Sequence, residues 1–153
     1  MSFNHGAVWW SELMTHDIDG AISWYGKVCG WIFETMRMAD GGLYHVAIAH
    51  GRPVAGITDM KPGEVSGNKG FPPRWFTYFA VDDVDLVIEQ ARAGGGEVIQ
   101  QPFDVPGVGR IGIVRDPTGA ALGVMRPYFP GDALVEQDRR DALGLNDLDN
   151  VPI

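Results

Sequence analysis

The sequence predicts an α+β fold in which two copies of one βαβββ module follow each other along a single chain of 153 residues. The segments WWSELMTHDID and WFTYFAVDDVD align with a constant offset, so that Trp9 matches Trp75 and Asp17 matches Asp83. In both copies, alternation typical of a strand changes after the aspartate to the three-to-four-residue spacing typical of a helix. Three short apolar runs follow each helix, which completes the module.

The first module begins with a strand at residue 8 and continues with a helix over residues 17–29. Asp17 is suited to cap the first turn, and Gly30 is suited to end the helix. The apolar positions Ile18, Ile22, Tyr25 and Cys29 recur at helical spacing, which predicts that Cys29 is a buried and inert thiol. Strands are predicted over 31–37, 43–49 and 53–60, with a tight turn at HGRP between the last two.

The second module repeats this order from residue 75. Asp83 is the predicted cap of a helix that ends at Gly94. Strands are predicted over 96–102, 110–115 and 120–126, with a tight turn at DPTG. We therefore predict one domain, 1–153, made of a first module (8–60), a Gly- and Pro-rich linker (61–74), a second module (75–127) and an acidic tail (128–153). The tail either docks on a partner subunit or is loose.

Composition limits the classes of partner. The chain holds 12 basic and 20 acidic residues, a net charge of −8, which disfavours nucleic acid and anionic membranes. One cysteine cannot form an internal disulfide, and the N-terminus lacks the pattern of a secretion signal. We expect a soluble cytoplasmic protein.

The paired helix segments DIDGAISWYGKVCGW and DVDLVIEQARAGGGEV, with the terminal RDPTGAALGVMRP, resemble the vicinal oxygen chelate superfamily of glyoxalase I, bleomycin-resistance proteins and extradiol dioxygenases. The resemblance implies that the modules form a half-open, mixed-sheet barrel around a cavity, and that the protein is a homodimer. One scaffold serves many reactions in this superfamily, so the fold alone does not name the chemistry.

The resemblance also implies where metal ligands would stand. Those positions are held by Trp10, Gly56, Phe76 and Gly123, whose side chains cannot coordinate a metal. A relocated site would need Glu12, His45, His50 and Asp59 to converge, which strand alternation opposes. We predict no metal and no cofactor.

Alternation instead predicts an aromatic and thioether lining for the cavity. The predicted ligand-binding residues are Trp10, Glu12, Met14, Gly56, Thr58, Phe76, Tyr78, Gly123 and Met125, with Arg110 at the mouth to bind a carboxylate. The repeat makes Glu12 and Tyr78 equivalent, which would place an acid and a phenol opposite each other across the cavity. Either they contact a ligand, as anchor or as catalytic base and acid, or they satisfy each other in a packed core.

The sequence thus predicts a metal-independent, bleomycin-resistance-like protein that binds a small aromatic or amphiphilic molecule. The alternative is an enzyme of the same superfamily, a lyase, isomerase or dioxygenase, which either uses Glu12 and Tyr78 without a metal or has a relocated metal site.

Overall fold

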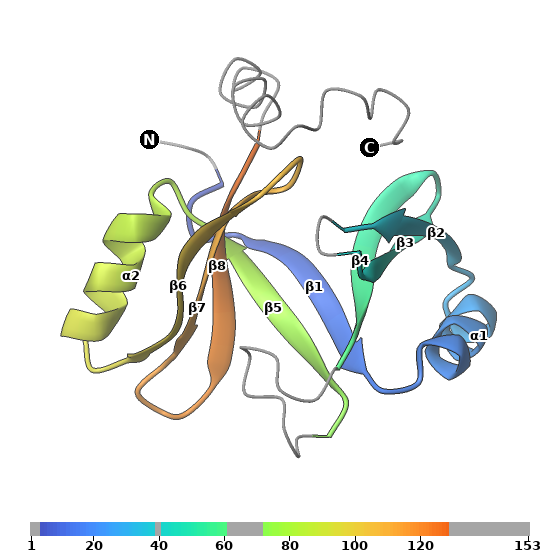
Figure 1. The fold of residues 1–153 in the computed structure, drawn as a ribbon, viewed down its shortest axis with the longest axis horizontal. Coiled ribbons are helices and arrows are strands. Elements are labelled where there is room, and N and C mark those ends of the chain that lie inside the picture. Colours follow the sequence, from blue (N-terminus) through green and yellow to red (C-terminus); the bar gives the residue numbers. More distant parts are fainter. Residues whose placement is uncertain (1–3, 39–40, 61–71, 129–153) are drawn as a thin grey trace. The chain divides into compact units, whose positions relative to one another are not determined.

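The computed structural model describes residues 4–38, 41–60 and 72–128, and their elements divide into two compact units. The first unit is Val8–Tyr78, and the second comprises residues before Val8 and from Phe79 onward. Figure 1 labels the elements along the chain. In each repeat a strand is followed by a helix and three strands, which confirms the predicted α+β class and its βαβββ order.

The first unit is a mixed sheet with one helix. Its strands are β1 (Val8–Thr15), β2 (Ile32–Arg37), β3 (Leu43–Ala49), β4 (Arg52–Asp59) and β5 (Arg74–Ala80), of which residues 74–78 belong to this unit. They are ordered β2-β3-β4-β1-β5. β1 and β4 run parallel, with Glu12 beside Gly56, whereas β2, β3 and β4 pair antiparallel. The parallel pairing of β1 and β4 therefore brings Glu12 next to a glycine.

The hairpin between β3 and β4 contains a change of register. Its two-residue turn, His50 and Gly51, has positive φ at both positions, as a type I′ turn requires. Next to the turn, Ile48 lies opposite Pro53, but beyond it Ala47 lies opposite Ala55, so that Val54 is an extra residue in β4. Beyond this bulge each residue of β3 pairs with the β4 residue one position further along than the turn alone would give. Val46, and not His45, therefore lies opposite Gly56.

Helix α1 (Ile18–Val28) begins where β1 ends. The Asp17 carboxylate accepts a 2.9 Å hydrogen bond from the amide of Gly20, and Gly30 has φ +68°, so both predicted ends of this helix are confirmed. No residue of α1 is fully buried. Cys29 caps the helix and is exposed, so the predicted buried thiol is wrong: the residue falls past the last helical residue, shortly before the chain enters β2.

The second unit places one helix on a three-stranded antiparallel meander. It contains helix α2 (Val84–Ala93), β6 (Glu97–Val105), β7 (Gly109–Arg115) and β8 (Ala121–Pro127), with strand order β8-β7-β6. Asp83 caps α2 through a 3.1 Å hydrogen bond from the amide of Leu86, as predicted. The helix stops at Gly94, as predicted, but the left-handed residue is the next one, Gly95, with φ +90°.

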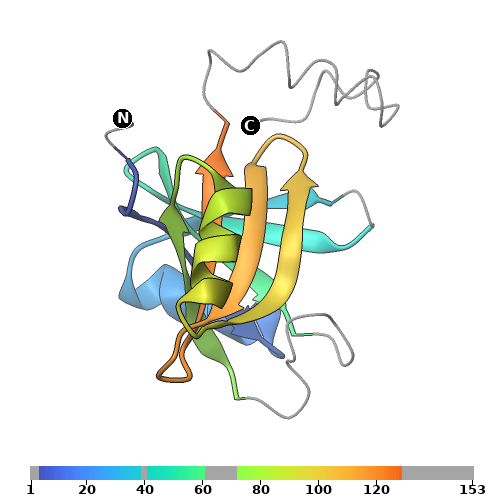
Figure 2. The ribbon, with the colours of Figure 1, turned by 90° about the vertical axis from the view of Figure 1, so that its left-hand side faces the viewer.

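Helix α2 covers its strands closely (Figure 2). Val84 and Ile88 are 2% and 1% exposed and form a core with Val81, Val114 and Val124. Gly112 on β7 permits this approach, since a Cβ there would stand 2.7 Å from Cδ1 of Ile88. The apolar spacing that predicted α2 therefore describes its buried face.

Two parts of the prediction lie outside the described residues. The tail from residue 129 and most of the linker, 61–71, are among the segments that the structure does not describe. The predicted domain boundaries stay predictions. Within the described ranges, no helix is long and apolar enough to cross a membrane.

Candidate functional site

The candidate site is built around Glu12 on β1. Its side chain is 8% exposed and lies on the face of the sheet opposite to Leu13, because neighbouring residues of a strand point to opposite faces. Register places Glu12 beside Gly56 and Met14 beside Thr58, so these four predicted residues share one face. A buried carboxyl group is costly unless polar partners surround it.

Tyr78 on β5 is the first of those partners. Its hydroxyl donates a 3.2 Å hydrogen bond to Oε2 of Glu12, and its own side chain is also 8% exposed. The two residues were predicted to face each other across a cavity, and this is wrong. Since β1 and β5 are neighbours in the sheet, the equivalent positions of the repeat lie side by side and contact directly. The Phe76 ring packs edge-on against Tyr78, with centroids 5.1 Å apart.

Tyr44 on β3 is the second partner. Its hydroxyl also hydrogen-bonds to Glu12 and accepts a 2.9 Å hydrogen bond from the indole Nε1 of Trp10. The phenol occupies the space above Gly56, where any Cβ would overlap the Tyr44 hydroxyl. The glycine that was predicted to leave room for a ligand therefore leaves room for this ring.

Burial sets the protonation chemistry of this cluster. Desolvation raises the pKa of Glu12 above its ordinary value of 4.5, and the hydrogen bonds from Tyr44 and Tyr78 oppose that rise only in part. Desolvation and the neighbouring carboxylate raise the pKa of Tyr44 and of Tyr78. Both phenols therefore remain protonated donors, and Glu12 keeps its proton to a higher pH than an ordinary glutamate does.

The residues do not fit a metal of the kind found in metal-dependent members. Trp10, Gly56 and Phe76 hold three of the positions implied for ligands, and the Tyr44 ring fills the space above Gly56. His45 lies on the other face, paired with Ile57 and 2.9 Å from Thr35 Oγ1 through its Nδ1. Within residues 4–38, 41–60 and 72–128, no group of three His, Cys, Asp or Glu side chains is arranged to hold a metal ion.

The remaining predicted site residues belong to the second unit. Gly123 and Met125 are buried on β8. Arg110 on β7 is bound within its own unit, because its guanidinium pairs with Asp85 at 2.7 Å and with Asp104 at 3.2 Å. The hydrogen bond from Arg110 lowers the pKa of Asp85, and the two pairs occupy the cation that was predicted to bind a ligand carboxylate. That role for Arg110 is not supported.

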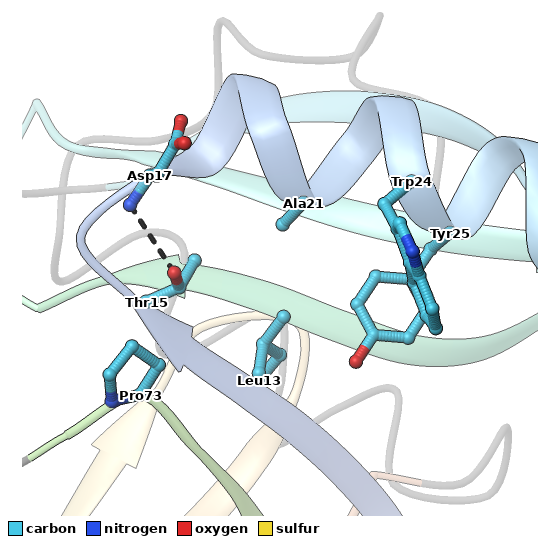
Figure 3. A pocket seen from close by; sticks show the side chains of 7 residues that line it. All are labelled: Leu13, Thr15, Asp17, Ala21, Trp24, Tyr25 and Pro73. Carbon is cyan, nitrogen blue, oxygen red and sulfur yellow. Dashed lines mark hydrogen bonds between the residues drawn. The ribbon is translucent and has the colours of Figure 1, made fainter.

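The opposite face of the first unit carries a shallow hollow of about 400 Å³ beside α1 (Figure 3). Leu13 rises from β1 and Ala21 descends from the helix into it, while Trp24 and Tyr25 stand at one end and Asp17 at the other. Asp17 is engaged there, as its side chain caps the helix and its amide donates to Thr15 Oγ1 at 3.2 Å. Because its one carboxylate already caps the helix, the hollow is a less suitable polar site than the Glu12 cluster.

Tyr44 is the site residue that sequence reasoning missed. The strand around it was predicted correctly, and an aromatic residue near a glycine on a paired strand is a recognisable signal. Its face, however, depends on the bulge at Val54. If Val54 were paired in register instead of being an extra residue, the turn would place His45, and not Val46, opposite Gly56.

Comparisons with known proteins agree with this fold. Residues 3–124 match the Glyoxalase/Bleomycin resistance protein/Dioxygenase superfamily. The chain is 39% identical over 123 residues to the Mycobacterium tuberculosis (strain CDC 1551 / Oshkosh) protein named "Putative glyoxylase CFP32", which covers 80% of the chain and 46% of that protein. It is 33% identical over 132 residues to the Streptomyces peucetius "Anthracycline biosynthesis protein DnrV", covering 81% and 48%.

A solved structure, methylmalonyl-CoA epimerase from Mycobacterium tuberculosis, superimposes with a TM-score of 0.61 at 20% identity, covering 87% of this chain and 97% of that one. At that identity the similarity concerns the fold alone. The chain spans about half the length of the two sequence relatives named above. Repeat, fold and sequence match lead to one conclusion: the chain belongs to the Glyoxalase/Bleomycin resistance protein/Dioxygenase superfamily.

Proposed function

We propose that this protein binds a small aromatic or amphiphilic molecule without a metal, and that Glu12 with its two tyrosines is the polar anchor of the site. The observation that carries the proposal is a buried carboxyl group bound by two phenols, bordered by Trp10 and Phe76. Ligand sites combine apolar and aromatic walls with a few polar groups that fix orientation. This cluster has that composition.

The side chains of the Glu12 cluster differ in their exposure to solvent. Trp10 and Tyr44 are partly exposed, whereas Glu12 and Tyr78 are buried. A ligand ring would meet the two outer aromatic side chains first, and its polar substituent would reach the carboxyl group by displacing or joining a phenol. The relative named for anthracycline biosynthesis gives independent support, since anthracyclines contain hydroxylated fused aromatic rings.

The alternative is an enzyme that uses Glu12 as general base or acid. A raised pKa brings a carboxyl group closer to neutral pH, where proton transfer is most efficient, and Tyr78 would be the hydrogen-bond donor beside it. The relative named as a glyoxylase agrees with catalysis in this superfamily. Binding is the first proposal because the phenols already satisfy Glu12.

A thermal-shift assay tests the proposal with alizarin, a dihydroxylated fused-ring compound, and with naphthalene as its apolar counterpart. A ligand that binds only the folded protein raises the unfolding midpoint. We expect alizarin to raise the midpoint of the wild-type protein more than naphthalene does, and Glu12→Gln to lose most of that difference. Equal shifts in the wild-type and Glu12→Gln proteins would place the binding site elsewhere.

His16→Ala is the matched control, because His16 follows the same strand but is exposed. It is expected to keep the full alizarin shift. To separate binding from catalysis, the recovered ligand is analysed by mass spectrometry after incubation. A changed ligand in the wild-type protein and an unchanged one with Glu12→Gln would favour the enzyme.

The homodimer and the cytoplasmic location stay predictions. For the dimer, the exposed apolar side of α1 is the surface that we propose for the contact, because Trp24 and Val28 stand one helical turn apart there and are 56% and 58% exposed.

A further inference from the structure

We propose that Trp10 is a positioning residue: through Tyr44 it directs a hydroxyl hydrogen onto Glu12 and thereby keeps this carboxyl group an acceptor for hydrogen-bond donors. The ligand part of this inference rests on the proposed function. The direction of the hydrogen bonds does not, because it follows from the side chains alone. Neither Trp10 nor Tyr44 has such a role in the sequence-based prediction.

The direction begins at the indole. A tryptophan Nε1–H can only donate, so the 2.9 Å contact with Tyr44 makes the phenolic oxygen the acceptor. A phenol has a single hydrogen, which is then free to point to the other partner of Tyr44, the carboxyl group of Glu12. Reversing the second bond would require the tyrosine oxygen to accept from both sides and leave its own hydrogen without a partner.

The phenol is also held in place by its surroundings. Its hydroxyl lies over Gly56, on the glycine's open side, and a side chain at that position would push the ring away. Donation by the indole polarises the hydroxyl and strengthens its bond to the carboxylate, since hydrogen bonds in a chain reinforce each other. Trp10 therefore acts on Glu12 through the hydroxyl of Tyr44.

The arrangement determines which ligand group fits. The titratable side chains that bind Glu12 are Tyr44 from β3 and Tyr78 from β5, whereas β4 faces it with Gly56. Both tyrosines supply hydrogens, and an ionised carboxylate has about four lone-pair positions. The remaining positions accept hydrogens, so the site selects a hydroxyl, enol or amine over a carbonyl oxygen.

Carboxyl-carbon NMR titration of the glutamate-labelled protein tests this, with the Glu12 signal assigned by its loss in Glu12→Gln. Tyr44→Phe removes one donor and is expected to raise the pKa of Glu12 by about one unit. Trp10→Phe keeps an aromatic ring and the phenol but removes the indole donor. It is expected to raise the pKa by a few tenths of a unit.

The double variant Trp10→Phe/Tyr44→Phe decides whether Trp10 acts through Tyr44. If it does, the pKa of Glu12 in the double variant equals that in Tyr44→Phe alone, because the effect of Trp10 needs the hydroxyl. An additive shift, or a Trp10→Phe protein that is folded and has an unchanged pKa, would overturn the proposal. A purely structural tryptophan would lower the unfolding midpoint without this dependence.

A second measurement needs no titration. The indole N–H proton of Trp10 is expected to move upfield in Tyr44→Phe and to stay in Tyr78→Phe, and the opposite pattern would contradict the relay. Both experiments are made without a ligand, so their failure is distinguishable from failure of the proposed function. If the relay holds but alizarin gives no shift, only the ligand class is rejected.

Discussion

The two helices of the repeat start from equivalent positions and reach different environments. Helix α2 buries Val84 and Ile88 almost completely, whereas α1 buries no residue fully and exposes Trp24 and Val28. Both have one apolar face at helical spacing. α1 leaves these two large apolar side chains exposed, and α2 leaves one, Leu86, which is 54% exposed. Amphipathic spacing therefore identifies a helix and its inner face, but it does not say how tightly that face packs.

The two units also differ in the polar groups that they bury. The core of the second unit around α2 is aliphatic, built from valine and isoleucine. The first unit buries Glu12 among hydroxyl and indole groups, on the face of the sheet opposite to Leu13. One unit therefore has a cluster of buried aliphatic side chains, and the other has a cluster of buried polar groups.

The largest expected effect separates the two helices. Ile88→Ala should lower the free energy of unfolding by about 3 kcal/mol, because a buried isoleucine leaves a cavity in a core that cannot collapse around it. Ile22→Ala, on the inner face of α1, removes a partly buried side chain and should cost about 1 kcal/mol. Urea denaturation measures both, and equal losses would show that α1 packs as firmly as α2.

The next effect concerns pH and the polar interior of the first unit. The pKa of Glu12 is raised in the folded state, so the folded chain binds this proton more tightly than the unfolded chain does. Stability from this group is therefore complete below pH 4.5, the ordinary pKa, and falls as the pH rises through the folded-state value. The loss is about 1.4 kcal/mol for each unit by which the pKa is raised.

Glu12→Gln removes this titration, so its free energy of unfolding should fall less than that of the wild type between about pH 4 and pH 8. Ala121→Ser, an exposed change on β8, is the matched control and should keep the wild-type slope. A wild-type protein that grows more stable over this range while Glu12→Gln does not would reverse the assigned direction of the pKa shift.

The smallest effect tests the exposed side chain of Trp24 on α1. Trp24→Ser should change the free energy of unfolding by no more than about 0.5 kcal/mol at low protein concentration, because the side chain is largely exposed. If a dimer covers this side chain, the same change lowers the molar mass seen by light scattering and removes the concentration dependence of the unfolding midpoint. Finding the wild-type protein monomeric at all concentrations would contradict the proposed dimer contact.

Much of the fold could be predicted from the sequence, because its strongest signals are local. Asp17 and Asp83 cap the helices as expected, and the strand over 43–49 has the predicted ends. The site was predicted less well. The contact between Glu12 and Tyr78 depends on which strands are neighbours in the sheet. The ion pairs of Arg110 depend on Asp85 and Asp104, which are distant in the sequence, so local periodicity does not predict them.

Tyr44 shows most clearly what could not be predicted from the sequence. Its strand and the following turn could be predicted, but a single extra residue of β4, beyond the turn, decides which face of β4 Tyr44 meets. No composition signal marks Val54 as that residue. Long-range packing and small irregularities of pairing therefore separate a predicted site from the observed one.

The bulge at Val54 decides which of two side chains, a phenol or an imidazole, lies beside Glu12. If Val54 paired with Ala47 instead of forming the bulge, an imidazole, His45, would turn toward Glu12 in place of the phenol of Tyr44. An imidazole beside a carboxylate is the beginning of a metal site, whereas a phenol beside it is a neutral hydrogen-bonding pair. A shift of register by one residue, with no change of sequence, would thus move this site from one chemistry toward the other.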